Sequence, residues 1–153
     1  MLELELEMTY LLDVRGPLEP KDGSPPSQRR QYWEMSKATL EGPRIRASTP
    51  MAGIDWLTPL DGGYGRPHVR LPFHTEDGAL VLLEYGGIVQ ASNAFLRAVE
   101  QDAPTEWSDQ YMRMALSFET TSPRYAWLTQ SLFVARGRLR GAKSIEYEVY
   151  RLR

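Results

Sequence analysis

Residues 2–10 read LELELEMTY, and this strict alternation decides the fold class. Leu2, Leu4 and Leu6 alternate with glutamates, and successive side chains of a β-strand point to opposite faces. A helix would spread the same leucines around its axis, so the pattern predicts a strand with one apolar face. Residues 145–149 (IEYEV) alternate in the same way. Strands near both ends of the chain favour a sheet that closes on itself.

Short strand-like stretches and turn signals fill most of the sequence between these ends. Residues 14–28 are rich in Pro, Gly and Ser and predict a loop, and residues 92–101 predict one helix, with Ser92 or Asn93 as its N-cap. This loop lies too near the N-terminus to divide domains, so residues 1–153 are expected to form a single domain. We predict an all-β fold: an antiparallel meander of about 8–10 strands closed into a β-barrel, with one accessory α-helix. A β-sandwich is the competing architecture.

The clearest hairpin surrounds the Asp-Gly pair at 77–78, which is typical of two-residue type I′ turns. If these two residues form the loop, Arg70 faces Tyr85 across the strands, with His74 on the same face and Glu84 on the opposite, apolar face. Such a polar face is either the solvent face of a half-buried sheet or the mouth or lumen of a small barrel. A slip of one residue would move every side chain to the other face.

Composition argues against several kinds of chemistry and partner. The chain has no cysteine, and its two histidines cannot form a three-histidine metal site. A net charge of −2 argues against duplex-DNA binding, which needs a basic face. The acidic, alternating start is unlike a secretory signal, and no apolar run reaches the ~18 residues of a membrane-spanning helix. We expect a cytoplasmic protein without metal, cofactor, nucleic acid or membrane partner, and spare apolar positions leave room for a homodimer.

Candidate catalytic residues are few, because a chain without cysteine must carry out any reaction with carboxylates, tyrosines, arginines and its two imidazoles. Asp55 comes first: it precedes Trp56, whose apolar ring would raise its pKa, although the pattern equally fits a turn-forming Asp. His74 is the other candidate for proton transfer, and an exposed strand histidine is the alternative interpretation. Arg113 either stabilises a developing oxyanion or forms a structural ion pair with Glu119.

A longer stretch, FETTSPRYAWL at residues 118–128, followed by LFVARG at 132–137, resembles the signature of an uncharacterised family, domain of unknown function 3237. Three earlier segments resemble other parts of the family pattern: residues 41–56, 75–79 and 111–113. The resemblance implies a compact, broadly lipocalin-like antiparallel barrel with an inner cavity, and no settled general activity. Departures from the pattern, such as His74 and Thr129, imply a pocket retuned for a different ligand.

These observations lead to three hypotheses. The first is a cofactor-independent acid–base enzyme, an isomerase, lyase or cyclase, which acts on an oxygenated, partly apolar metabolite in the barrel cavity. Asp55 or His74 would move the proton, and Arg113 would stabilise the oxyanion. The predicted substrate-binding residues are Trp56, Arg70, Glu84, Tyr85, Glu119, Tyr125 and Trp127. The second hypothesis is a non-catalytic small-ligand-binding barrel, and the third is a barrel filled by side chains whose surface binds a partner.

Overall fold

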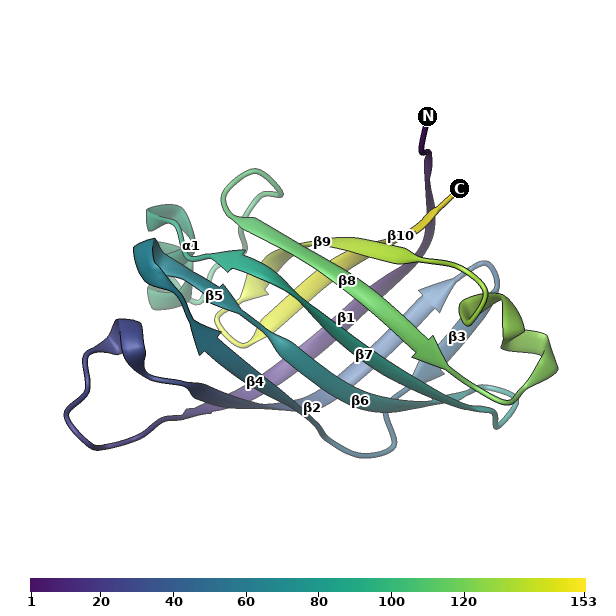
Figure 1. The fold of residues 1–153 in the computed structure, drawn as a ribbon, viewed down its shortest axis with the longest axis horizontal. Helices are drawn as coiled ribbons and strands as arrows, with labels where there is room; N and C mark the ends of the chain where they lie inside the picture. Colours follow the sequence, from purple (N-terminus) through teal and green to yellow (C-terminus); the bar gives the residue numbers. More distant parts are fainter.

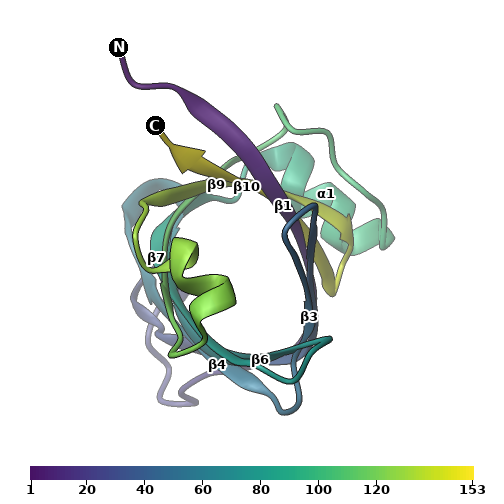
Figure 2. The same ribbon diagram turned by 90° about the vertical axis from the view of Figure 1, so that its right-hand side faces the viewer.

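The structure, a computed structural model, describes residues 1–153 except for the side chain of Pro26. Ten antiparallel strands form one sheet that is rolled into a barrel (Figures 1 and 2). The strands are β1 (Leu4–Leu18), β2 (Gln31–Gly42), β3 (Ile45–Ser48), β4 (Gly53–Pro59), β5 (Tyr64–Arg66), β6 (His68–Thr75), β7 (Leu80–Gln90), β8 (Tyr111–Glu119), β9 (Phe133–Gly141) and β10 (Ser144–Leu152). The helical segments are α1 (Asn93–Gln101) and the 3-10 helices η1 (Pro26–Gln28), η2 (Asp61–Gly63) and η3 (Pro123–Leu128). The predicted all-β barrel with an accessory helix is confirmed.

The first strand closes the barrel, because β1 pairs with β10 along one edge and with β2 along the other. Tyr10 shows this directly: it faces Tyr147 in β10 and Leu40 in β2. Val14 also pairs with β2, and β1 continues to Leu18. The prediction of a loop beginning at residue 14 is therefore wrong at its start, because backbone pairing overrides the local Pro and Gly signals.

A β-bulge at Glu7 divides β1 into two parts, and the alternation of inward and outward side chains is reversed between them. The register with β10 shifts between Leu6 and Met8, which leaves Glu7 without an opposite residue. After the bulge Met8 points into the core, whereas Leu4 and Leu6 before it lie on the outer wall and are 58% and 52% exposed. The single apolar face predicted for residues 2–10 is therefore wrong for the leucines that precede the bulge.

The helix α1 connects β7 to β8 and begins where the sequence predicts. Ser92 is its N-cap, with its side-chain oxygen accepting a hydrogen bond from the backbone N–H of Phe95 at 3.1 Å. The helix ends at Asp102, which adopts a left-handed conformation with φ 50°. Among the described residues, no helix is long and apolar enough to cross a membrane.

One end of the barrel is closed by η3, which lies across the opening in Figure 2. Tyr125 is buried, and Trp127 packs edge-on against Phe133 with 6.1 Å between ring centroids. The guanidinium of Arg44 lies 3.7 Å from the Trp127 ring centroid and donates at 2.6 Å to the buried carboxylate of Glu7. Stacking and ion pairing thus hold η3 against the end of β1.

The β6–β7 hairpin has a three-residue loop, not the predicted two-residue loop. The Thr75 N–H donates to the carbonyl of Ala79, and the Gly78 N–H donates to the carbonyl of Thr75. Gly78 has φ +87°, as the last loop residue of this turn requires. An Asp-Gly pair suits this turn as well as a type I′ turn, so the sequence alone does not distinguish the two.

The extra loop residue shifts the hairpin register by one position. Val69, not Arg70, faces Tyr85, and Arg70 faces Glu84. Tyr85 is therefore buried on the inner wall, whereas Arg70, Glu84 and His74 are exposed on the outer wall. The predicted face that combined Tyr85 with Arg70 and His74 is wrong.

Asp77 in this loop fastens η3 to the barrel. Its carboxylate accepts hydrogen bonds from the Thr75 hydroxyl at 2.6 Å, the Tyr125 hydroxyl at 2.7 Å and the Arg124 guanidinium at 3.0 Å. These contacts, the bond from Thr75 most of all, lower the pKa of Asp77 to about 2. These contacts join the β6–β7 hairpin to η3, although the two segments are distant in sequence.

We expect Tyr125→Phe to lower the free energy of unfolding by about 1 kcal/mol, because it removes one hydrogen bond and leaves the ring in place. Urea unfolding at neutral pH measures this change. An unchanged unfolding midpoint would show that the Tyr125 hydroxyl does not hold η3.

We also expect the stability advantage of the wild type over Asp77→Asn to depend on pH. The charged form of Asp77 stabilises the fold above the unfolded pKa, and this contribution is lost as the pH falls from about 4 to about 2. Urea unfolding midpoints of both proteins across that interval test the sign. A difference that stays constant below pH 4 would contradict the lowered pKa.

Candidate active site

Asp55 lies on the inner wall of the barrel, in the half that carries α1. Along β4 its neighbours Ile54 and Trp56 point outward, at 45% and 48% exposure, whereas Asp55 is half-buried between them. The residues opposite Asp55 are Trp33 in β2 and Val69 in β6. Opposed residues share a face, so the tryptophan beside Asp55 is Trp33 and not Trp56.

Burial raises the pKa of Asp55 to about 6. The backbone N–H of His68 donates to its Oδ1 at 3.0 Å and partly opposes this shift. No ion pair to Asp55 exists among the residues that the structure describes, because the His68 imidazole contacts Glu84 at 2.9 Å instead. Asp55 can therefore exchange a proton near neutral pH, as a general acid or base must.

Three tyrosines fill the centre of the lumen close to Asp55: Tyr10 from β1, Tyr85 from β7 and Tyr147 from β10. The rings of Tyr10 and Tyr147 stack with centroids 5.4 Å apart, and the hydroxyls of Tyr10 and Tyr85 form a hydrogen bond of 3.1 Å. Burial raises the pKa of all three phenols, and the nearby charge of Asp55 raises each further. They are therefore neutral hydrogen-bond donors at physiological pH.

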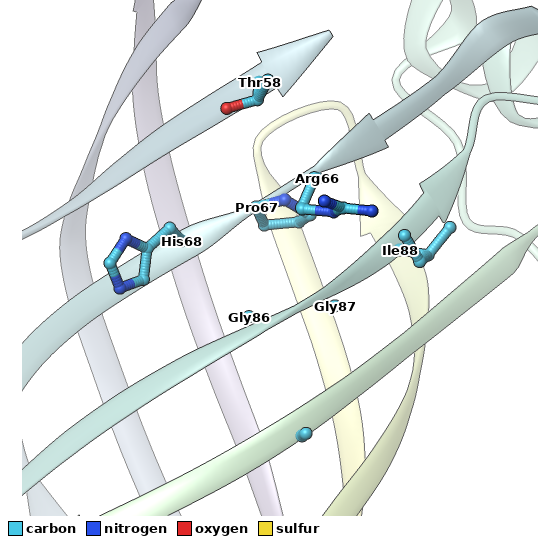
Figure 3. A pocket seen from close by; sticks show the side chains of 8 residues that line it. Thr58, Arg66, Pro67, His68, Gly86, Gly87 and Ile88 are labelled. Atoms are coloured by element: carbon cyan, nitrogen blue, oxygen red, sulfur yellow. The ribbon is translucent and has the colours of Figure 1, made fainter. Parts of the chain in front are cut away.

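The two ends of the lumen differ in their contact with solvent. At the α1 end Gln31, Trp33 and Leu57 are half-buried, whereas η3 covers the opposite end. Two depressions lie on the outer wall, and one of them surrounds Gly86 and Gly87 (Figure 3). The inner cavity that the family resemblance implies stays a prediction.

Several predicted site residues lie on the outer wall, away from Asp55. They are Trp56, Arg70, His74, Glu84, Arg113 and Glu119. Strand alternation places Trp56 outside because Asp55 is inside, and the shifted hairpin register does the same for Glu84. Arg113 lies over the ring of Tyr111 at 5.2 Å, and it has no ion pair with Glu119 in the part of the chain that is described.

Glu84 is exposed and contacts two basic side chains. It contacts the His68 imidazole at 2.9 Å and the Arg70 guanidinium at 3.5 Å. The hydrogen bond from His68 is the largest cause of a lowered pKa of Glu84. The predicted place of Glu84 on the apolar face is therefore wrong. No group of three His, Asp or Glu side chains that could hold a metal ion occurs within the described residues.

The remaining predicted residues lie inside the barrel but at different depths. Tyr85 lies with Asp55 in the lumen, whereas Tyr125 and Trp127 belong to η3 at the closed end. Tyr10 and Tyr147 were not predicted as neighbours of Asp55. The sequence does contain a feature that points to them, because both occupy apolar positions of the alternating terminal strands, and these strands pair to close the sheet.

Solved structures of other proteins share the whole fold. A conserved protein of unknown function from Rhodopseudomonas palustris superposes with a TM-score of 0.86 at 24% identity, covering 100% of this chain and 98% of that one. A beta-barrel like protein from Acinetobacter baumannii gives a TM-score of 0.81 at 26% identity, covering 100% and 97%. An enzyme from Penicillium herquei gives a TM-score of 0.71 at 16% identity, covering 99% and 95%, which shows likeness of fold alone.

Two curated relatives bear the name UPF0311 protein. A UPF0311 protein of Clostridium acetobutylicum is 26% identical over 106 residues, which span 69% of this chain and 67% of that protein. A UPF0311 protein of Rhodopseudomonas palustris is 38% identical over 65 residues, or 42% of each chain. Residues 2–152 match the family described as Protein of unknown function (DUF3237). The resemblance seen in residues 118–128 is thereby confirmed, and the chain belongs to the DUF3237 family.

Proposed function

We propose that this protein is a cofactor-independent acid–base enzyme, an isomerase, lyase or cyclase, acting on an oxygenated, partly apolar metabolite. One observation carries the proposal: Asp55 is an unpaired carboxyl on the inner wall, half-buried, with its pKa raised to about 6. Strongly shifted carboxyls without a structural ion pair are typical of catalytic sites. The barrel fold, which this chain shares with an enzyme from Penicillium herquei, is compatible with such a role.

In the proposed reaction the Asp55 carboxylate removes a proton from a carbon next to a carbonyl group. The electron pair of the broken C–H bond moves toward the carbonyl oxygen, which becomes an enolate. Of the two hydroxyls in the Tyr10–Tyr85 pair, one donates to the other, so the second O–H is free to donate to this oxygen. Where a C=C bond is conjugated with the enolate, return of the proton to the far carbon of that bond gives an isomer. Where the β-carbon carries a leaving group, its departure with the C–X electron pair gives a lyase product.

The substrate class follows from the side chains around Asp55. Trp33, Val69 and the tyrosines offer apolar and aromatic contacts, so a neutral substrate with a ring or short chain suits this site. Met112 and Met114 are buried on the inner face of β8, and methionine side chains adapt readily to a ligand. A ligand at the α1 end would lie between these groups.

His74 and Arg113 have no part in this mechanism, although the sequence suggested roles for both. Their side chains are exposed on the outer wall, and the sheet separates them from Asp55. The proposal therefore assigns proton transfer to Asp55 and oxyanion stabilisation to the tyrosines.

We expect Asp55→Asn to become more stable relative to the wild type as the pH rises from about 4 to about 7. An acid whose pKa is raised by folding binds more protons in the folded chain, so the wild type loses stability over this interval, by about 2 kcal/mol. Urea unfolding at several pH values measures the difference. A difference that does not change with pH would mean that the pKa of Asp55 is ordinary.

We further expect the protein to catalyse exchange of the acidic C–H protons of small aromatic ketones for deuterium, with a rate that rises through about pH 6. Proton NMR of 2-tetralone and 1-indanone in D₂O measures this rate. Asp55→Asn should lower the catalysed rate by roughly 100-fold, because it removes the base. Tyr85→Phe should lower it by about 10-fold or more, because it removes one donor from the hydroxyl pair.

Matched controls come from the closed end of the barrel. Asp77→Asn and Tyr125→Phe make the same chemical changes there and should leave the exchange rate at the wild-type value. Equal rates for the wild type and Asp55→Asn would overturn the enzyme proposal. Binding of a ketone without exchange would instead support the alternative, a non-catalytic small-ligand-binding barrel.

A further inference from the structure

A shallow trough crosses the outer wall over β7 and β8. It exists because Gly86 and Ala115 face each other across the two strands and contribute almost no side chain. The depression around these residues (Figure 3) joins a second one through Gly87 and Ile88, which lie in both. We call the combined surface the outer trough; it is separate from the lumen that holds Asp55.

The rim of the outer trough is apolar toward β1. Leu4, Val134 and Tyr150 line it, and Leu4 remains 58% exposed. Leu6 lies on the same wall and is 52% exposed, because the bulge at Glu7 turns both leucines outward. Exposed leucines gathered beside a depression are typical of a surface that contacts another protein.

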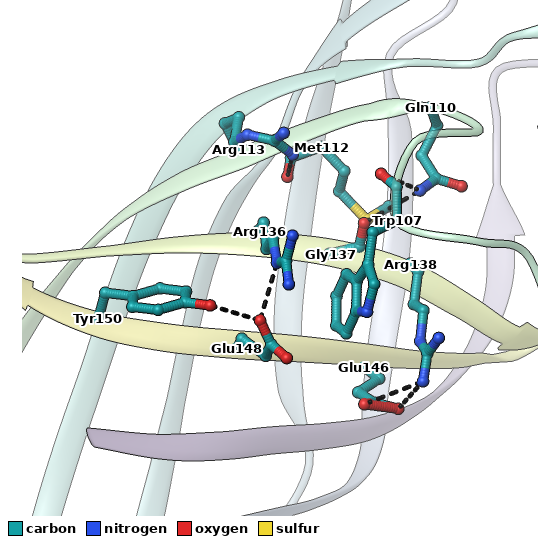
Figure 4. Close-up of polar contacts among 10 residues, drawn as sticks. All are labelled: Trp107, Gln110, Met112, Arg113, Arg136, Gly137, Arg138, Glu146, Glu148 and Tyr150. Atoms are coloured by element: carbon teal, nitrogen blue, oxygen red, sulfur yellow. Dashed lines mark hydrogen bonds and ion pairs between the residues drawn. The ribbon is translucent and has the colours of Figure 1, made fainter. Parts of the chain in front are cut away.

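The trough also carries uncompensated positive charge. Arg113 faces Arg136 directly across β8 and β9, and like charges in opposed positions repel. Arg136 is neutralised by Glu148 at 2.8 Å (Figure 4). Arg113 has no acidic partner among the residues that the structure describes, and the same holds for Arg66 on the other side of Ile88.

The chain itself carries a segment of complementary chemistry. Residues 1–3, here called the N-terminal arm, precede β1 and project beyond the barrel (Figures 1 and 2). Leu2 is 75% exposed, and the carboxylate of the exposed Glu3 makes no ion pair within the described part of the chain. The arm thus presents an apolar side chain next to an unpaired acid.

We propose that the outer trough binds the N-terminal arm of a second copy of this chain. Leu2 of each copy would cover the hollow at Gly86 and Ala115 of the other, and each Glu3 would pair with the opposite Arg113. A two-fold axis makes these contacts reciprocal, so one trough and one arm per chain satisfy the whole interface. The charge pairing fixes the orientation, and the leucines bury the apolar surface.

Sedimentation velocity of the full chain at about 1–100 µM tests this dimer. We expect the wild type to dimerise, with a dissociation constant that rises with salt. Arg113→Glu and Glu3→Arg should each raise that constant by about 10-fold or more, and combining them should restore it to within about 3-fold of the wild type. Arg97→Glu, the same charge change on the exposed face of α1, is the control and should leave the constant unchanged.

The outcomes separate this proposal from its rivals. A wild type that stays monomeric throughout this range overturns it, and so does a dimer that ignores Arg113→Glu. A double variant that dimerises no better than either single variant also overturns it, because the charges would then not face each other. Circular dichroism of each variant verifies that a lost dimer is not a lost fold.

Discussion

The inner wall of this protein depends on the double pairing of β1. This strand pairs with β10 on one side and with β2 on the other, so the sheet has no free edge here. In a closed barrel, every second side chain of each long strand points inward. That closure brings Tyr10 and Tyr147 face to face, although they lie near opposite ends of the sequence. The bulge at Glu7 then lets the same strand present tyrosine to the lumen and leucine to solvent.

Asp55 is the main departure from what stability alone would favour on this inner wall. A carboxyl among aromatic rings, with one backbone hydrogen bond and no paired cation within the described residues, is held where its charged form is poorly solvated. Two other acids of the barrel have a different environment. Glu7 and Asp77 are paired with arginines, and both fasten η3. This contrast between the arginine-paired Glu7 and Asp77 and the half-buried Asp55, which has no ion pair within the described residues, is the reason to assign chemistry to Asp55.

Much of the architecture could be predicted from the sequence, because it follows from local periodicity. Alternation in residues 2–10 indicated a strand, Ser92 marked the start of α1, and residues 118–128 pointed to the family. Register was harder, since an Asp-Gly pair suits two turns that differ by one residue, and that difference moved Arg70 and Glu84 together to the outer wall. Cross-strand neighbours were harder still: Trp33 reaches Asp55 only through the pairing of β2 with β4, which no local pattern encodes.

The position of η3 at one end of the barrel limits the routes by which a ligand could reach Asp55. Asp77 and Arg44 hold η3 from two sides, so η3 closes this end of the barrel. Under the proposed function, a substrate would therefore reach Asp55 from the α1 end, and its product would leave by the same end. A single entrance favours a reaction of one substrate over a reaction in which two reactants must meet. The rate of turnover would then depend on how fast the product leaves by this end.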